Sequence, residues 1–327
     1  MMKQNIYVTR RLPQAAMELL EKNFQVECNP FDRVLHREEL REQVKGRDGL
    51  LALLTDRIDE EVLEAAGKQL RVIANYSVGF NNIDVAKATA RKIAVTNTPG
   101  VLTDTSADLT LALILGVARR LVESDKYVRA GKFEGWGPLL FLGADVHGKT
   151  LGLMGFGRIG YAVAKRAMGF DMRVLYHDTH RADPEREKQV QAQYVDRDTL
   201  LKEADFLSIH VPLTPETDRF VGAREFSLMK PTAYLINTAR GKIIDEGELV
   251  WALKNKEIAG AGLDVFEHEP AVHPALLTMD QVILLPHIGS ASIETRTKMG
   301  LMAAENLIAF FKGQVPPNCV NPEVFGK

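Results

Sequence analysis

The sequence predicts an α/β protein with two doubly wound parallel sheets, because short apolar strands alternate with amphipathic helices along the whole chain. Its 327 residues exceed the roughly 250–300 that one hydrophobic core supports, which favours two domains. A glycine-rich turn, Gly155-Phe-Gly157-Arg-Ile-Gly160, stands near the start of the second series of strands. We therefore expect one sheet on either side of residue 100.

The first series of predicted elements lies before residue 100. Runs of Val, Ile, Leu and Ala bounded by turn residues are typical of buried parallel strands, and apolar residues spaced three to four apart are typical of helices. Strands are predicted at Asn5–Thr9, Gly49–Leu54, Arg71–Asn75 and Ile93–Thr96, and helices at Pro13–Glu21, Ile58–Ala66 and Asp84–Arg91.

A long apolar helix is expected between the two series. The pattern changes around Thr98-Pro99-Gly100, and the residues from Asp104 to Val122 predict one helix that is apolar on nearly every side. Such a helix has to be buried, so we expect it to pack between domains or subunits.

The second series contains six predicted strands separated by helices. Six strands with helices between them make a complete Rossmann-like sheet of the kind that binds dinucleotides. The strands are expected at Lys149–Met154, Arg173–Tyr176, Phe206–His210, Ala233–Asn237, Gly260–Asp264 and Val282–Leu285.

The glycine-rich turn has the surroundings of a dinucleotide-binding loop, since a predicted strand precedes it and a predicted helix, Tyr161–Met168, follows. Gly155 permits a tight turn, Gly157 lets the backbone approach a pyrophosphate, and Gly160 lets the helix pack closely on the strand. The N-terminus of the helix then faces the phosphate charge. We expect a nicotinamide dinucleotide to bind here.

Asp178 is expected to determine which nicotinamide dinucleotide binds. It ends the next predicted strand, 18 residues after Gly160, where a carboxylate accepts hydrogen bonds from the adenosine ribose. Its charge repels a 2′-phosphate, which favours NAD over NADP. His180 and Arg181 follow at once and are able to bind that phosphate, so NADP stays possible.

Arg240, Glu269 and His287 are the candidate catalytic residues, and each stands at or after the C-terminal end of a predicted strand, where open α/β sheets bind ligands. Reduction of a 2-keto acid builds negative charge on the keto oxygen, so a proton donor has to lie within reach. A histidine beside a carboxylate suits this role, and a guanidinium holds the substrate with paired donors. We assign His287 as the acid/base, Glu269 as its partner and Arg240 as the clamp.

Two other histidines compete for the role of proton donor. His268 adjoins Glu269, and we interpret it as part of the loop surface. His210 ends a predicted strand, which leaves open whether it lines the cofactor cleft.

Composition and charge disfavour several other classes of protein. A formal net charge of −2 gives no reason to expect nucleic acid or an anionic membrane as a partner. Cys28 and Cys319 stand in unrelated contexts, which argues against a cysteine-based metal site and for a reducing compartment. No stretch reaches the roughly 18 apolar residues of a membrane span, and the N-terminus lacks the apolar run of a signal peptide. We expect a cytoplasmic protein that binds no metal.

The last predicted helix, from Ile293 to Lys312, is long enough to run back to the first sheet. The first domain is therefore expected to be discontinuous. Residues 1–99 plus 288–327 would form a flavodoxin-like substrate domain, and residues 100–287 would form the Rossmann domain that binds NAD(P) and includes the helix at 104–122.

Taken together, these motifs resemble the D-isomer-specific 2-hydroxyacid dehydrogenase family, and within it the glyoxylate/hydroxypyruvate reductase branch. The likeness covers essentially the whole chain and implies NAD(P)H-dependent reduction of a short 2-keto acid. The family likeness rests on Gly155–Gly160, Asn237–Gly241, Gly262–Phe266 with Glu269-Pro270, and Pro286–Ser290. The branch likeness rests on Tyr76–Phe80, Asn97–Asp104 and Phe141–Gly143.

The resemblance also implies roles for individual residues. The substrate is expected to contact Arg240, His287 and the loop Ser77-Val78-Gly79, whose backbone amides match those that bind the substrate carboxylate. Family members are dimers, so a homodimer is implied, with Trp136 reaching into the partner subunit's site. Asp264 matches the residue that contacts the nicotinamide carboxamide. The expected cofactor-binding residues are Gly155, Gly157, Arg158, Ile159, Gly160, Asp178, Val211, Pro212, Thr217, Thr238, Ala239, Asp264 and Gly289.

Several activities on the same scaffold stay open, namely 2-ketogluconate reductase, D-lactate-type dehydrogenase and phosphonate dehydrogenase. Formate dehydrogenase is disfavoured, because that branch pairs its histidine with glutamine where this chain has Glu269. Phosphoglycerate dehydrogenase often carries a regulatory extension that this sequence lacks. A transcriptional corepressor that senses NAD(H) is a different class, and its long disordered tails are not expected here; a turnover assay separates it from an enzyme.

Overall fold

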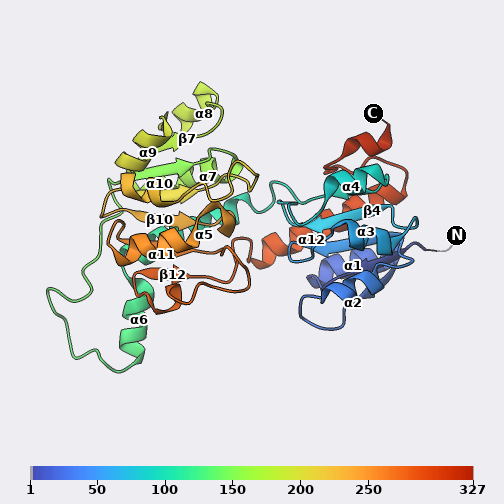
Figure 1. The fold of residues 1–327 in the computed structure, drawn as a ribbon, viewed down its shortest axis with the longest axis horizontal. Coiled ribbons are helices and arrows are strands. Elements are labelled where there is room, and N and C mark those ends of the chain that lie inside the picture. Colours follow the sequence, from blue (N-terminus) through green and yellow to red (C-terminus); the bar gives the residue numbers. More distant parts are fainter. Residues whose placement is uncertain (1–2, 327) are drawn as a thin grey trace. The chain divides into compact units, whose positions relative to one another are not determined.

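The computed structural model describes residues 3–326, and these divide into two compact units (Figure 1). Unit 1 takes the residues up to Leu102 and those from Ser290 onward, and unit 2 is Thr103–Gly289. Each unit is a parallel sheet covered by helices, and unit 1 is discontinuous in sequence. The fold class predicted from the sequence is therefore confirmed.

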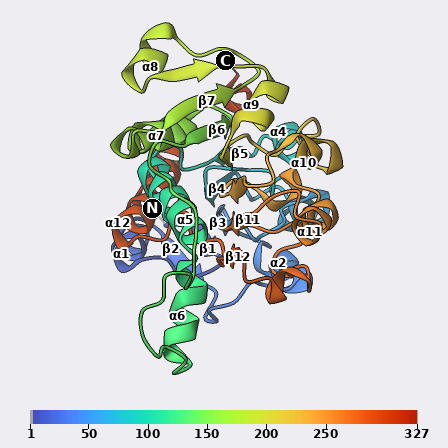
Figure 2. The same ribbon diagram turned by 90° about the vertical axis from the view of Figure 1, so that its left-hand side faces the viewer.

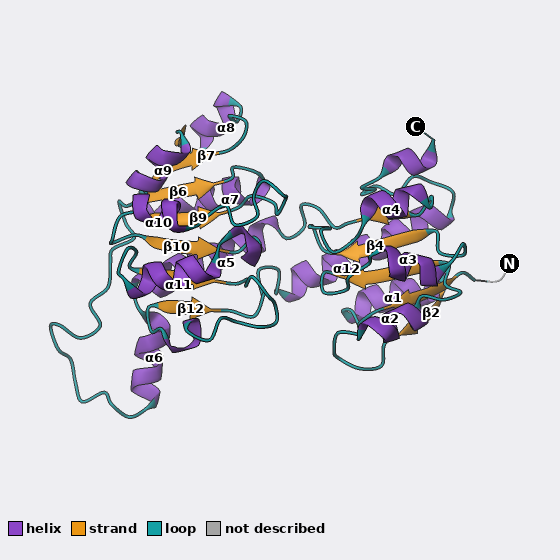
Figure 3. Cartoon of the chain, viewed as in Figure 1, coloured by secondary structure: helices purple, strands orange, loops and turns teal. Residues whose placement is uncertain are grey.

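Unit 1 contains a parallel sheet with helices around it (Figure 3). Its five strands follow the order β2-β1-β3-β4-β5, which is the flavodoxin-like doubly wound order. The central strands β1, β3 and β4 are almost wholly buried, as expected for strands with helices on both faces. The strands are β1 (Asn5–Val8), β2 (Gln25–Cys28), β3 (Gly49–Leu53), β4 (Val72–Tyr76) and β5 (Ala94–Thr96).

Helices cover both faces of this sheet. One face packs against α1 (Gln14–Asn23) and α12 (Ile293–Phe311), with side chains such as Leu20 and Leu307 fully buried. The opposite face packs against α2 (Arg37–Gln43), α3 (Glu60–Ala66) and α4 (Val85–Ala90). The alternation of inward and outward residues along each strand thus feeds two separate hydrophobic clusters.

Side-chain caps fix where several of these helices begin. The Asp59 carboxylate accepts from the amide of Val62 at the start of α3, and Asp84 accepts from Lys87 at the start of α4. Ser292 accepts from Thr295 at the start of α12. Each cap satisfies one of the amides that the first turn of a helix leaves without a partner.

Unit 2 contains a seven-stranded parallel sheet in the order β12-β11-β10-β9-β6-β7-β8. The order reverses between β6 and β9, which is the switch point where open α/β sheets bind ligands. The strands are β6 (Thr150–Met154), β7 (Arg173–His177), β8 (Ala192–Tyr194), β9 (Phe206–Ile209), β10 (Tyr234–Asn237), β11 (Gly260–Leu263) and β12 (Val282–Leu284).

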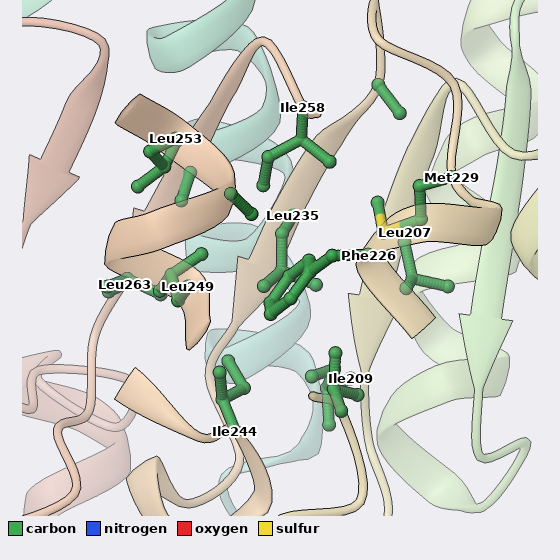
Figure 4. Packing of buried hydrophobic residues seen from close by; sticks show 14 of the residues in the cluster. Leu207, Ile209, Phe226, Met229, Leu235, Ile244, Leu249, Leu253, Ile258 and Leu263 are labelled. Carbon is green, nitrogen blue, oxygen red and sulfur yellow. The ribbon is translucent and has the colours of Figure 1, made fainter. Parts of the chain in front are cut away.

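Two hydrophobic clusters sandwich this second sheet. The larger one joins the sheet to α9 (Arg197–Glu203), α10 (Ala223–Leu228) and α11 (Glu246–Lys254), and Phe226 lies among Leu207, Ile209 and Leu235 at its centre (Figure 4). The other joins the opposite face to α5 (Thr103–Ala118) and α7 (Arg158–Ala167). After β7, this unit also contains the helix α8 (Pro184–Gln189). Short 3-10 helices occur in unit 2 at Met168–Phe170, Gly241–Ile243 and Leu276–Thr278, and in unit 1 at Pro322–Phe325.

The single helix predicted from Asp104 to Val122 is wrong at its C-terminal end. The structure has α5 ending at Ala118, a left-handed Arg120 with a φ of 53°, and a new helix, α6 (Leu121–Arg129). The carbonyl of Ala118 accepts from the amide of Ala144, 2.9 Å away, so the later loop ends the helix. Within unit 2, α5 packs on the sheet and on α7, whereas α6 and the loop after it extend away from the rest of that unit (Figures 1 and 2).

Short and half-exposed elements were not predicted. β2 has the sequence Gln-Val-Glu-Cys and is partly exposed, and β8 is only three residues long, so neither gives an apolar run. β8 makes unit 2 a sheet of seven strands rather than the six expected. Among residues 3–326 there is no helix with both the length and the apolar character needed to cross a membrane.

Candidate active site

The glycine-rich turn follows β6 and is tightly enclosed by backbone. Gly155 has a φ of +98°, and a Cβ there would lie 2.8 Å from the carbonyl carbon of His210. A Cβ on Gly160 would lie 2.3 Å from the carbonyl oxygen of Gly155. Both positions therefore require glycine, because any side chain would push β9 or the turn away from α7.

The start of α7 is left open toward this turn. Gly157 is the N-cap and supplies no side-chain acceptor, so the first amides of this ten-residue helix have no side-chain cap. Uncapped amides and the positive end of the helix dipole form a site for a phosphate group. The residues present therefore fit the pyrophosphate of a dinucleotide.

Asp178 lies directly after β7 and binds the turn itself. One carboxylate oxygen accepts from the amide of Phe156 at 2.8 Å, and the other accepts from the amide of Thr179 at 2.7 Å. The side chain thus joins the second strand of the unit to the glycine-rich turn. This contact was not predicted from the sequence, which gave Asp178 a role toward the ribose alone.

The neighbouring cation, Arg181, is held in an ion pair. Its guanidinium donates to both oxygens of Glu187 at 2.9 and 2.8 Å, and Tyr176 donates to the same carboxylate. The hydrogen bond from Arg181 holds the pKa of Glu187 below its ordinary value. Arg181 therefore shares its charge with Glu187, and only the three N–H donors that this pair leaves over are available to a 2′-phosphate.

Arg186 is a residue near the turn that sequence reasoning missed. It belongs to α8, donates to the carbonyl of Gly157 at 2.7 Å, and lies over the rings of Tyr161 and Phe156 at 4.6 and 5.4 Å. These contacts hold the turn from the side of α8. Only the packing of α8 against the turn could have shown this, since no motif links residue 186 to residues 155–160.

His287 and Glu269 are in direct contact. Nδ1 of His287 lies 2.9 Å from Oε2 of Glu269, and the two side chains keep 25% and 31% of their surfaces exposed. Burial alone would raise the pKa of Glu269, but the hydrogen bond with His287 and its charge, together with the amide of Phe266 and the charge of Arg240, hold it below its ordinary value. Glu269 is therefore ionised near neutral pH.

The buried Asp264 fixes the backbone around His287. Its two carboxylate oxygens each accept at 2.7 Å, one from the amide of Ile288 and the other from the amide of Gly289, while its carbonyl accepts from the amide of His287. His287 has a φ of 55°, a left-handed conformation that costs a non-glycine residue of order 1–3 kcal/mol. Asp264 thus keeps the histidine in an unusual conformation, in addition to any contact with a cofactor.

Arg240 is positioned by two local features. Asn237, which is fully buried, donates to the carbonyl of Arg240 at 2.9 Å and accepts from the amide of Ala239 at 3.0 Å. A Cβ on Gly241 would lie 1.8 Å from the carbonyl carbon of Phe266, so only glycine lets this loop approach the chain that leads to Glu269. Burial lowers the pKa of Arg240, and the charge of Glu269 opposes this effect.

The rival histidines have different surroundings. Nε2 of His210 lies 2.8 Å from the hydroxyl of the buried Ser208, and burial lowers the pKa of His210 to about 3, so its ring is neutral. His268 keeps 71% of its side-chain surface exposed and lies 3.7 Å from Glu267. Of these three histidines, His287 is the one with a carboxylate partner at hydrogen-bond distance.

The other residues assigned to the cofactor lie in unit 2, in loops at the C-terminal edge of its sheet or in the first turn of α7. After β9, the Thr217 hydroxyl donates to the carbonyl of Pro212 at 2.6 Å and shapes the loop that begins at Val211. After β10, the Thr238 hydroxyl lies 3.1 Å from that of Thr110 on α5. Arg158 and Ile159 begin α7, Ala239 follows Thr238, and Gly289 is bound by Asp264.

Two sets of assigned substrate residues lie elsewhere. Ser77, Val78 and Gly79 follow β4 in unit 1, where Ser77 is buried and the other two are half-buried. Trp136 lies in the loop after α6 in unit 2 and is 86% exposed. The roles of these residues stay predictions.

Comparison with known proteins bears on this geometry. Residues 111–289 match the family described as D-isomer specific 2-hydroxyacid dehydrogenase, NAD binding domain. The glyoxylate reductase of Thermococcus litoralis is 51% identical over 99% of this chain and 98% of its own length. The glyoxylate reductase of Korarchaeum cryptofilum is also 51% identical, over 99% of this chain and 97% of its own.

Solved structures give the same result. The crystal structure of a glyoxylate reductase from Paecilomyes thermophila is 34% identical, with a TM-score of 0.87, over 99% of this chain and 100% of that one. An NADPH-dependent glyoxylate/hydroxypyruvate reductase from Sinorhizobium meliloti, solved with NADP and malonate, is 33% identical, with a TM-score of 0.85, over 97% of each chain. The resemblance inferred from the motifs is thereby confirmed. This chain belongs to the D-isomer-specific 2-hydroxyacid dehydrogenase family and is an NAD(P)-dependent enzyme.

Proposed function

We propose that this chain reduces glyoxylate or hydroxypyruvate to the 2-hydroxy acid, with NADH as the preferred donor. The observation that supports it best is the pairing of His287 with an ionised Glu269, beside Arg240, on the same sheet as an open glycine-rich turn. The names of the relatives point to the same substrates.

His287 donates the proton that the developing alkoxide needs. When bound, NADH supplies the hydride that adds to the keto carbon. Nδ1 of His287 is occupied by Glu269, so Nε2 carries the proton that goes to the keto oxygen. The ionised Glu269 stabilises the imidazolium, and Asp264 holds the histidine's backbone.

Arg240 stabilises the charge that builds on the substrate. Asn237 holds the backbone carbonyl of Arg240, and the guanidinium donates to the carbonyl of Ala239 at 2.7 Å. The guanidinium stays charged, since arginine is not deprotonated in proteins. Partial burial strengthens its attraction for the carboxylate and the keto oxygen of the substrate. The amides of Val78 and Gly79, in unit 1, bind the substrate carboxylate.

A panel of 2-keto acids tests the function directly. We expect oxidation of NADH with glyoxylate or hydroxypyruvate at a kcat/KM above that with pyruvate or 2-ketogluconate. Absorbance at the reduced-nicotinamide band gives the rates. A chain that binds NADH but turns over none of these acids would contradict the proposal and favour a sensor of NAD(H).

Cofactor preference is expected to follow the charge of Asp178. A 2′-phosphate would meet this carboxylate, while Arg181 is bound to Glu187, so we expect kcat/KM to favour NADH over NADPH by about 10-fold or more, or about 1.4 kcal/mol. Asp178→Asn removes the charge and keeps an oxygen acceptor for the amide of Phe156. This variant should lower the ratio of kcat/KM with NADH to kcat/KM with NADPH several-fold, while activity with NADH stays measurable. A wild-type preference for NADPH would show that Asp178 does not face the ribose.

Glu269→Gln is expected to shift the pH dependence of reduction. Wild-type Glu269, with its lowered pKa, is charged throughout the neutral range and favours protonated His287. Glutamine supplies no charge to pair with the ring of His287, so the rate of reduction should fall off at a lower pH than in the wild type. The pH profile of kcat/KM for glyoxylate measures this. Identical profiles for the two proteins would mean that the carboxylate does not assist His287.

We further propose that the chain forms a homodimer in the cytoplasm. The support is a run of exposed apolar side chains on α6 and the loop after it, on a segment that extends away from the rest of unit 2. Such a patch is unusual on a monomer. Sedimentation velocity of the purified chain tests the oligomeric state. The exposed apolar side chains on α6 and the loop after it are Leu121, Val122, Val128, Phe133, Trp136, Leu139, Leu140 and Leu142.

A further inference from the structure

Three consecutive carbonyls of the loop after β4 are each held by a donor from within unit 1. The carbonyl of Ser77 accepts from the amide of Thr98 at 2.9 Å, and that of Val78 accepts from Nδ2 of Asn97 at 2.8 Å. The carbonyl of Gly79 accepts from Nδ2 of Asn75 at 2.9 Å. All three donors lie at or just after the ends of the neighbouring strands β4 and β5. A hydrogen bond therefore fixes each of these three carbonyls.

These three hydrogen bonds also determine the direction of the backbone N–H groups in the loop. A trans peptide group is planar, so its N–H points opposite to its carbonyl. With the carbonyls of Ser77, Val78 and Gly79 turned to their donors, the N–H groups of Val78, Gly79 and Phe80 point the other way. Within residues 3–326 no protein acceptor is recorded for these three amides. Adjacent amides with a common direction form a concavity that binds an anion.

Asn97 is itself held by the C-terminal segment of unit 1. Its amide donates to the carbonyl of Asn318 at 3.2 Å, and its carbonyl accepts from Nδ2 of Asn306 at 3.2 Å. Asn306 is fully buried on α12, and its side-chain oxygen accepts from both nitrogens of Asn318. The backbone of Asn97 is therefore fixed through both its amide and its carbonyl, at the position from which its side chain donates to Val78.

Asn75, which holds the carbonyl of Gly79, is anchored in a comparable way. It is fully buried, and its side-chain oxygen accepts from Nδ2 of Asn82 at 3.3 Å. Asn82 in turn donates to the carbonyls of Leu53 and Asp56, both at 3.1 Å. Buried amides with all partners satisfied are rigid, because every alternative leaves a polar group unpaired.

We propose that Asn97 and Asn75 are positioning residues that hold the amides of Val78, Gly79 and Phe80 ready for the carboxylate of the substrate. The inference rests on the proposed function and assigns part of the enzyme's affinity for the acid, beside that due to Arg240, to two residues that do not touch the acid. Asparagine suits both positions, because aspartate cannot donate to a carbonyl and would repel the anion. The acid is thus held by peptide dipoles in unit 1, without a lysine or arginine at that loop.

Asn97→Leu tests this, since leucine keeps the size of the side chain and removes the donor. The carbonyl of Val78 then loses its partner, so the peptide group that carries the amide of Gly79 is no longer held in one direction. We expect the KM for glyoxylate to rise about 10-fold or more, kcat at saturating glyoxylate to stay within about threefold, and the Kd for NADH to be unchanged. Asn97→Asp should raise the KM further, because its charge opposes the acid.

Asn23→Leu is the matched control. Asn23 also lies in unit 1 and donates through Nδ2 to a carbonyl, that of Leu19, at 2.8 Å, but at the end of α1. The KM and kcat of Asn23→Leu for glyoxylate should equal those of the wild type. Hydrogen exchange gives a second readout: the amide of Thr98, which donates to Ser77, should exchange faster in Asn97→Leu and not in Asn23→Leu. If Asn97→Leu is insoluble, Asn97→Ala, which also removes the donor, serves with the same expectations.

The outcomes separate this inference from the proposed function. A wild type that reduces glyoxylate, with an unchanged KM in Asn97→Leu, overturns the inference alone. A wild type that reduces no 2-keto acid overturns the proposed function. In that case, titration calorimetry with oxalate decides the inference: weaker binding to Asn97→Leu than to the wild type supports it, and equal binding overturns it.

Discussion

Replacing His287 by asparagine is expected to lower kcat for glyoxylate reduction at least about 100-fold, while NADH still binds with the affinity of the wild type. The imidazole is the group paired with an ionised carboxylate, at 2.9 Å, and asparagine cannot donate a proton at neutral pH. Asparagine is the chosen replacement because it tolerates the left-handed backbone that Asp264 imposes at residue 287. Stopped-flow or steady-state kinetics with NADH measures the loss.

His268→Asn is the control for this variant. His268 adjoins Glu269 in sequence but is mostly exposed, so its removal should change kcat less than twofold. A wild-type turnover number in His287→Asn, or an equal loss in both variants, would remove His287 from the role of proton donor.

Arg240→Lys should have an effect of similar size, with a fall in kcat/KM of about 100-fold to 1,000-fold. Lysine keeps the charge but not the planar fork of donors that holds a carboxylate and a keto oxygen together. The fall in kcat/KM is made larger because the loop that carries residue 240 cannot shift to compensate. The backbone of Gly241 packs directly against that of Phe266. The measurement is kcat/KM for glyoxylate at saturating NADH.

Arg224→Lys is the matched control for that change. Arg224 also lies in unit 2 and is ion-paired with Asp198, but it is 60% exposed, and such pairs contribute little. Its kcat/KM should match that of the wild type. If Arg240→Lys also keeps its kcat/KM, the guanidinium fork has no part in catalysis.

Much of the fold was predictable because its signals are local. Buried strands such as β3 and β12 are continuous apolar runs, and the turn at Gly155–Gly160 combines three glycines with a strand before it and a helix after it. The contact of His287 with Glu269 could be anticipated from chemistry, since each residue follows a predicted strand of the same sheet.

The remainder depends on contacts that are distant in sequence. α5 ends at Ala118 because the amide of Ala144 binds its carbonyl, and no pattern near residue 118 indicates this. Arg186 reaches Gly157 only because α8 folds against the turn. The carbonyl of Val78 meets Asn97 through the parallel pairing of β4 and β5. Such contacts follow from tertiary packing, which overrides local preference.

The discontinuity of unit 1 has a consequence for how the chain is made. Domains generally fold during synthesis in the order in which they leave the ribosome. Here all of unit 2 is complete before α12 exists, whereas the first 102 residues must wait for it. Until then Ala16 and Leu20 of α1 lack the cover that Ala303 and Leu307 provide in the finished protein. The nascent chain therefore carries an apolar face through most of its synthesis, and the part made first is the last to become protected.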